Sequence, residues 1–151
     1  MVVSHSKISA QAPGPVTRWV DVGPVCNDRC GFCPVSPQWG GVAREGAALV
    51  HEINRARSEG CDEIVLFGGE PTIHPQFMAT ASRIADAGMK TSIFTNGRMF
   101  AYANFCRKVV AVANAGTVYV AFHGIGRSHE VAVGTTSYQE VLSGLRNMVG
   151  A

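Results

Sequence analysis

The segment Glu63-Ile-Val-Leu-Phe-Gly-Gly-Glu-Pro71 predicts a short strand over 63–67 that ends at two glycines. Three other β-rich runs, at 19–22, 91–94 and 118–122, flank it along the chain, and each is followed by apolar residues at helical spacing. Successive strand–helix units imply a parallel sheet with right-handed crossovers. The α/β pattern fits both an open sheet and part of a barrel.

Helices are predicted between and after these strands. The first covers about 43–59, and Pro75 is predicted to begin the second. Ser137 and Glu140 stand three residues apart, which predicts a capping box at the start of the last helix. The predicted apolar faces are Ala43, Ala47, Val50 and Ile53 in the first helix, Phe77, Ala81 and Ile84 in the second, Met99, Tyr102, Phe105, Cys106 and Val109 in the third, and Tyr138, Val141, Leu142, Leu145 and Met148 in the last.

Length and composition indicate a globular protein with a substantial core. The chain has 151 residues, of which 46% are hydrophobic and 16% charged, with a net charge of +2. Its Lys and Arg residues are scattered, so no nucleic-acid or membrane-surface patch is predicted. Residues 1–15 look like a flexible tail without a signal-peptide core, and no run reaches transmembrane length, so a cytoplasmic location is expected.

The cysteines carry the strongest chemical signal. The chain has five, and Cys26, Cys30 and Cys33 form the spacing C-x3-C-x2-C in the loop after the first strand. Three thiolates on one loop suit a [4Fe–4S] cluster with one iron left open, whereas a structural zinc site usually has four ligands in two pairs. Two alternatives stay open: incidental cysteines, and a zinc site that recruits a histidine such as His51, His74 or His123. Cys61 and Cys106 are predicted to be core residues.

Further motifs follow the other strands. Phe32 makes the cysteine motif C-x3-C-x-aromatic-C, Gly68-Gly69-Glu70-Pro71 follows the second strand, and Thr95-Asn96-Gly97 follows the third. The fourth strand leads into Phe122-His123-Gly124. Together these motifs resemble the radical S-adenosylmethionine (radical SAM) superfamily, over residues 18 to about 148.

The resemblance implies a fold as well as a chemistry. Residues 16–151 correspond to the N-terminal part of a (β/α)6 partial TIM-like barrel, with four of the six units and an apparent truncation after the fourth. The motifs would converge on the rim formed by the carboxyl ends of the strands, where such barrels do their chemistry. The unfinished sheet predicts poor solubility of the chain on its own.

The resemblance also implies site roles. Cys26, Cys30 and Cys33 would hold the [4Fe–4S] cluster, whose open iron binds S-adenosylmethionine and cleaves it to a 5′-deoxyadenosyl radical that attacks an unknown substrate. The implied cofactor neighbours are Phe32 near the adenine, Gly68 and Gly69 near the methionine part, Glu70 as a direct contact or a loop anchor, Pro71 fixing the turn, and Asn96 and His123 near the methionine or ribose part. No general acid or base is assigned.

Partners and competing functions complete the expectation. A reductant such as flavodoxin or ferredoxin would supply the electron, and the substrate cannot be read from the sequence. The alternative function is a non-catalytic iron–sulfur or zinc-binding module, for example a redox sensor. A nucleotide-binding domain would need a glycine-rich loop after the first strand, where the cysteine loop stands.

Overall fold

A computed structural model describes residues 16–35, 40–114 and 116–150. The tail predicted for residues 1–15 lies outside this range. The described chain forms a four-stranded sheet in the order β1-β2-β3-β4, and every neighbouring pair is parallel. The strands are β1 (Thr17–Asp21), β2 (Glu63–Phe67), β3 (Lys90–Thr95) and β4 (Val118–Val120). The predicted α/β fold with a parallel sheet is therefore confirmed.

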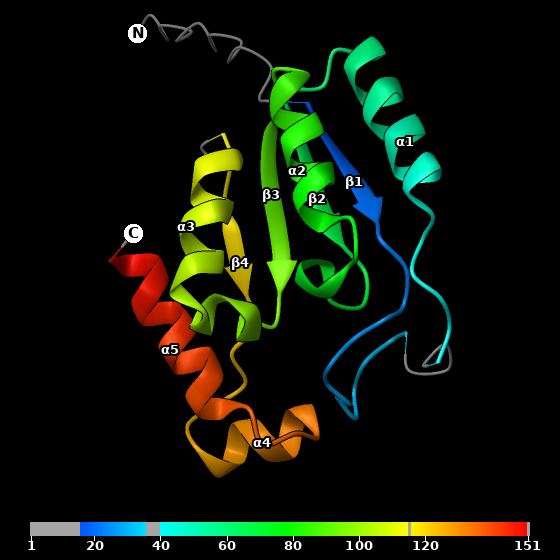
Figure 1. Ribbon diagram of the computed structural model, residues 1–151. Helices are drawn as coiled ribbons and strands as arrows, with labels where there is room; N and C mark the ends of the chain where they lie inside the picture. Colours follow the sequence, from blue (N-terminus) through cyan, green and yellow to red (C-terminus); the bar gives the residue numbers. More distant parts are fainter. Residues whose placement is uncertain (1–15, 36–39, 115, 151) are drawn as a thin grey trace, which may run out of the picture.

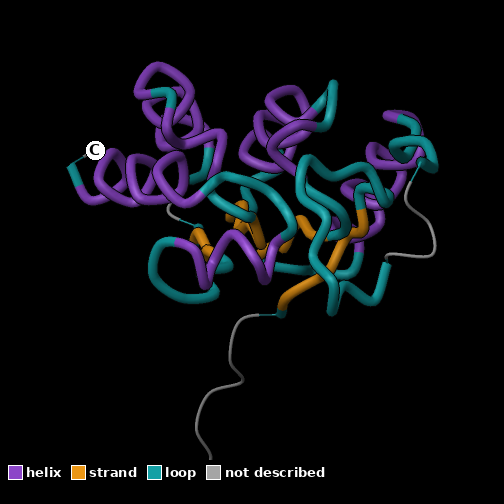
Figure 2. The backbone as a smooth tube through the Cα atoms, turned by 90° about the horizontal axis from the view of Figure 1, so that it is seen from below, coloured by secondary structure: helices purple, strands orange, loops and turns teal. Residues whose placement is uncertain are grey.

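The helices lie mainly on one side of the sheet (Figures 1 and 2). On that side are α1 (Gly46–Ser58), α2 (Phe77–Asp86), α3 (Ala103–Val112) and α5 (Tyr138–Val149). A short helix, α4 (Arg127–Val133), lies instead beyond the carboxyl ends of the strands (Figure 1). Two 3-10 turns follow β2 and β3, namely η2 (Pro71–Ile73) and η3 (Arg98–Ala101). Over the described part of the chain, no helix has the length and apolar character that crossing a membrane requires.

The core lies between the sheet and the helices. Side chains alternate along each strand, so every second residue of β1, β2 and β3 points toward the helical layer. The strand residues in this core are Val20, Ile64, Leu66 and Ile93, and their main helix partners are Leu49, Ile53, Phe77, Ile84, Phe100 and Val109. The opposite sheet face carries the exposed rings of Trp19, Phe94 and Tyr119.

The first two helices begin later than predicted. Arg44 donates its backbone N–H to the carbonyl of Val22 (2.9 Å), so the chain still runs extended beside the end of β1 there. Helix α1 therefore starts at Gly46, and its buried face is Leu49, Ile53 and Ala56, of which the sequence predicted only Ile53. Pro75 precedes α2 instead of opening it.

The region after β3 also differs from the prediction. Tyr102 separates η3 from α3 and is exposed, so the predicted continuous helical face is broken. Helix α4 was not predicted at all. In α5 the fully buried residues are Val141 and Gly144.

The predicted capping box does not form. The Ser137 side chain makes no cap hydrogen bond, and its oxygen instead accepts from the hydroxyl of Thr135 (3.2 Å). Glu140 is drawn away from the helix start because its carboxylate pairs with Nε of Arg98 (2.6 Å). A long-range ion pair thus replaces the local cap.

Candidate functional site

One pocket, of about 300 Å³, lies at the carboxyl ends of the strands. It brings together most of the predicted site residues, namely Cys26, Phe32, Cys30, Cys33, Gly68, Gly69, Asn96 and His123. Its remaining lining residues are Trp19, Asp28, Pro34, Phe67, Phe94, Thr95 and Ala121. Glu70 and Pro71 are buried behind it and do not line it.

The three motif cysteines are unpaired thiols that share this pocket. Burial and then the nearby Asp28 carboxylate raise the pKa of Cys30 to about 11, and Cys26 and Cys33 add to the rise. Burial also raises the pKa of Cys26. A thiol with a pKa of about 11 keeps its proton at neutral pH, so a metal must displace the proton of Cys30 on binding. The donor set suits iron or another thiophilic metal.

The three cysteine side chains are not arranged around a common centre. Within residues 16–35, 40–114 and 116–150, no group of three or more His, Cys, Asp or Glu side chains is arranged to hold a metal ion. His74 is engaged elsewhere, because Nε2 contacts the Arg44 carbonyl (2.9 Å) and Nδ1 accepts from the Gln76 N–H (3.1 Å). Both ring nitrogens of His74 are thus occupied by backbone groups.

The two glycines after β2 let the cysteine loop lie against the strand end. The N–H of Gly69 donates to the Gly23 carbonyl (2.8 Å), and that of Glu70 donates to the Val25 carbonyl (2.8 Å). A β-carbon on Gly69 would overlap the carbonyl oxygen of Val25. Gly68 has φ +131°, a conformation that favours glycine. In the structure, the group that lies close to these glycines is therefore the backbone of the cysteine loop.

Glu70 joins the loops that follow β2 and β3. Its side chain is only 1% exposed. Oε1 accepts from the N–H and hydroxyl of Thr72 (3.0 and 2.5 Å) and from the hydroxyl of Thr95 (2.7 Å), while Oε2 accepts from the Asn96 N–H (2.6 Å). Burial raises the pKa of Glu70, and the four hydrogen bonds act in the opposite direction. Of the two predicted alternatives, this geometry is that of a loop anchor.

Asn96 connects the loop after β3 to the cysteine loop. Its Nδ2 donates to Oδ1 of Asn27 (2.7 Å). Arg98 adds two bonds to the same loop, to the carbonyl of Asn27 (2.5 Å) and to Oδ1 of Asp28 (2.9 Å). Sequence reasoning did not single out Asn27, Asp28 or Arg98. All three lie beside or within the predicted motifs, and this position could have pointed to them. Their contacts could not be predicted, because Arg98 and Asp28 are some 70 residues apart in the chain.

Aromatic rings form the apolar wall of the pocket. Trp19 contacts Phe67 and Phe94, with ring centroids 5.7 and 5.2 Å apart. Phe32 packs edge-on against His123 at 4.8 Å and remains 60% exposed. Trp19, Phe67 and Phe94 were not predicted as site residues. Their placement follows from strand alternation, which turns them to the sheet face without helices.

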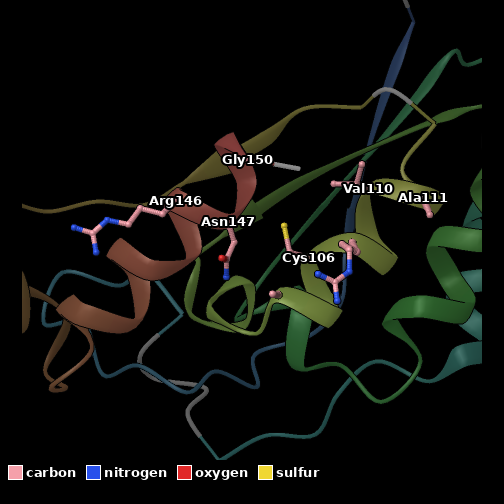
Figure 3. A pocket seen from close by; sticks show the side chains of 8 residues that line it. Cys106, Val110, Ala111, Arg146, Asn147 and Gly150 are labelled. Carbon is pink, nitrogen blue, oxygen red and sulfur yellow. The ribbon is translucent and has the colours of Figure 1, made fainter.

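A larger groove of about 540 Å³ lies elsewhere, between α3 and α5 (Figure 3). Cys106 and Asn147 line it, while the side chain of Arg146 extends away from the others in the view. None of the predicted cofactor-site residues lines this groove. The larger volume of this groove therefore does not identify it as the functional site.

Solved structures share this fold. The chain superposes on "Native anSMEcpe with bound AdoMet" with a TM-score of 0.74 and 15% identity, covering 90% of this chain and 41% of that one. It also superposes on Streptococcus suis SuiB with a TM-score of 0.65 and 20% identity, covering 83% of this chain and 28% of that one. The chain thus spans less than half the length of either protein.

Sequence comparison completes the assignment. A search of curated protein sequences gives no match. The family model described as "Radical SAM superfamily" matches residues 20–151, which include the cysteine motif, the two glycines and the loop after β3. This chain belongs to the radical SAM superfamily.

Proposed function

We propose that this chain holds a [4Fe–4S] cluster through Cys26, Cys30 and Cys33 and uses it to cleave S-adenosylmethionine reductively. One observation carries the proposal. In a member of the radical SAM superfamily, three free thiols with C-x3-C-x2-C spacing line the same pocket as Gly68 and Asn96, at the carboxyl ends of parallel strands. Membership implies SAM-dependent radical chemistry, and the pocket shared by these residues supports them as its site.

The chain's own residues would bind and orient the reactants. When bound, the cluster supplies the electron that splits S-adenosylmethionine into methionine and a 5′-deoxyadenosyl radical. Phe32 would pack near the adenine, and His123, whose ring contacts Phe32 at the pocket, would lie beside the methionine or ribose part. Gly68, Gly69 and Asn96 would lie beside the methionine part.

Water exclusion would come from the aromatic wall. Trp19 and Phe94 present apolar rings to the pocket, which would keep solvent from the reacting atoms. Glu70 and Pro71 would act from behind, by keeping the loops after β2 and β3 in register. We assign no proton transfer to either residue.

The proposal names a class of electron donor and leaves the substrate unassigned. One solved relative is described as SuiB bound to the precursor peptide SuiA, and it is 18% identical to this chain, which covers 27% of it. A likeness of that extent does not carry a substrate over. We propose a reductant of the flavodoxin or ferredoxin type and a reducing, cytoplasmic setting that keeps the thiols free.

The test is anaerobic reconstitution with iron and sulfide, followed by reduction and EPR spectroscopy with and without S-adenosylmethionine. We expect a [4Fe–4S] signal in the wild type that shifts when S-adenosylmethionine is added. Cys30→Ala is expected to lose the signal. Cys61→Ala is the matched control, because Cys61 packs against the core away from the pocket and its loss should leave the spectrum unchanged.

Each other outcome has a definite reading. A cluster whose spectrum ignores S-adenosylmethionine would favour the non-catalytic iron–sulfur module over the enzyme. Zinc bound in place of iron, and lost in Cys30→Ala, would favour a zinc-binding module. A folded protein that takes up no metal would overturn the proposal.

A further inference from the structure

His129 is a buried histidine on α4 to which the sequence assigned no role. It is 1% exposed, and its ring lies among those of Phe122 (centroids 5.3 Å apart), Tyr138 (6.2 Å) and His123 (6.2 Å). With Val133, one turn later, it forms the buried face of this short helix. That face meets the cysteine loop, because the Arg29 N–H donates to the Val133 carbonyl (2.8 Å).

The hydrogen bonds of His129 fix where its proton sits. The backbone N–H of His123 donates to Nδ1 (3.2 Å), so Nδ1 must present its lone pair. A neutral ring then carries its proton on Nε2. Nε2 is buried and has no partner among the described residues, and burial lowers the pKa of His129 and so favours the neutral ring. The Nε2–H of His129 is therefore a buried hydrogen-bond donor, and a buried donor requires an acceptor.

A matching acceptor lies in the cysteine loop. Asp28 is 2% exposed, and Oδ1 accepts from the hydroxyl of Thr135 (2.6 Å) and from Arg98 (2.9 Å). Its other oxygen, Oδ2, is buried and has no partner in the described part of the chain. Thr135 stands two residues after α4, and the Asp28 carboxylate is close enough to oppose the effect of burial on the pKa of His129.

We propose that His129 is a positioning residue whose Nε2–H reaches Oδ2 of Asp28 through one buried water, since both atoms are buried and neither has a partner among the described residues. One ring would then hold the cysteine loop by one nitrogen and the His123 backbone by the other. Asp28 stands between Cys26 and Cys30, and the His123 side chain packs on Phe32 in the pocket. The effect on a bound cluster rests on the proposed function, whereas the hydrogen bond itself does not.

The bond is tested first on the metal-free protein. Long-range ¹H–¹⁵N NMR at neutral pH should show His129 as the neutral tautomer protonated at Nε2, with a slowly exchanging Nε2–H proton. Exposed His51 is the internal reference for fast exchange. Asp28→Asn keeps an acceptor for Thr135 but can place an amide N–H opposite Nε2, so the His129 proton signal should shift or vanish. A ring protonated at Nδ1, or an Nε2–H that exchanges as fast as that of His51, overturns the proposal.

The positioning role is tested on the reconstituted protein by the rate of iron release to a chelator. His129→Phe and Asp28→Asn should each release iron about tenfold faster, as expected for a lost hydrogen bond to a charged group. The double variant should be no faster than the faster single variant, because both changes remove the same bond. His129→Gln, which can return an N–H to this position, should stay within about threefold of wild type. Rates that multiply in the double variant would overturn the positioning role, and a wild type without iron would instead count against the proposed function.

Discussion

At the scale of single residues, Gly69 shows how tightly the cysteine loop is fitted to the strand end. A methyl group at this position would overlap the Val25 carbonyl and the backbone of Pro24. Backbone atoms cannot rotate away, so the cysteine loop itself must move. We expect Gly69→Ala to lose most of its iron on reconstitution, measured as iron per chain by a colorimetric assay.

Gly31 provides the control within the same motif. It lies between Cys30 and Cys33, yet an added β-carbon would meet no other atom within 4 Å. Gly31→Ala should therefore keep wild-type iron content. Equal iron in both variants would show that the contact between the glycines and the cysteine loop does not matter for metal binding.

Glu70 makes a second prediction at this scale. Glu70→Gln replaces one buried carboxylate oxygen by an NH₂ group, which must then face a donor such as the Asn96 N–H. Leaving buried donors unpaired costs about 1–3 kcal/mol, so the free energy of unfolding in urea should fall by that amount. Glu140→Gln is the control, since Glu140 is half exposed and its pair with Arg98 is worth about 0–1 kcal/mol. Equal losses would contradict the anchoring role of Glu70.

Which site residues could be predicted depends on how far apart their partners lie in the chain. Cys30, Gly68 and Asn96 could be predicted because each belongs to a short motif at a strand end. Asp28 and His129 do not, since their importance comes from burial and from partners on other elements. The sequence around Asp28 and His129 does not indicate these contacts with distant elements.

At the scale of elements, strands were predicted better than helices. The β2 bounds agree with the prediction because its apolar run ends at two glycines, which no strand continues through easily. Helix α4 was missed because its seven residues are too few to show a clear helical spacing of apolar residues. Its end is bound instead by backbone hydrogen bonds from the cysteine loop. The predicted start of α5 was right, but its cap was not, because Glu140 pairs with Arg98 instead.

Helix α5 gives a prediction in which packing opposes helix propensity. A β-carbon on Gly144 would lie 2.5 Å from the Gly97 carbonyl oxygen and 3.2 Å from Cβ of Phe100. Propensity alone favours Gly144→Ala by about 1 kcal/mol. Overpacking costs about 1–3 kcal/mol, so we expect a net loss in the free energy of unfolding, measured in urea.

The control for this prediction is Gly46→Ala at the start of α1. There the three atoms nearest to the added methyl group all belong to the far end of the Gln76 side chain, which can rotate away. Gly46→Ala should leave stability within about 0.5 kcal/mol of wild type. A gain in stability for Gly144→Ala would mean that α5 does not pack on η3 as closely as described.

At the scale of the whole molecule, the four-stranded sheet is open, and β4 is one of its edges. An apolar groove of about 350 Å³ runs beside this edge, and its lining includes Val118, Val120 and Val149. A free strand edge next to apolar surface favours association with another chain. We therefore predict that the 151-residue polypeptide self-associates, so that its mass by sedimentation rises with concentration.

Two substitutions of identical chemistry locate the contact. Val149 is 90% exposed and lines the groove, whereas Val42 is 84% exposed and lies outside it. Val149→Lys should weaken self-association about tenfold, because the groove would have to bury an unpaired charge, and Val42→Lys should match wild type. Equal effects of the two lysines would place the contact elsewhere, and a wild type that stays monomeric at high concentration would show that the open edge is protected by the chain itself.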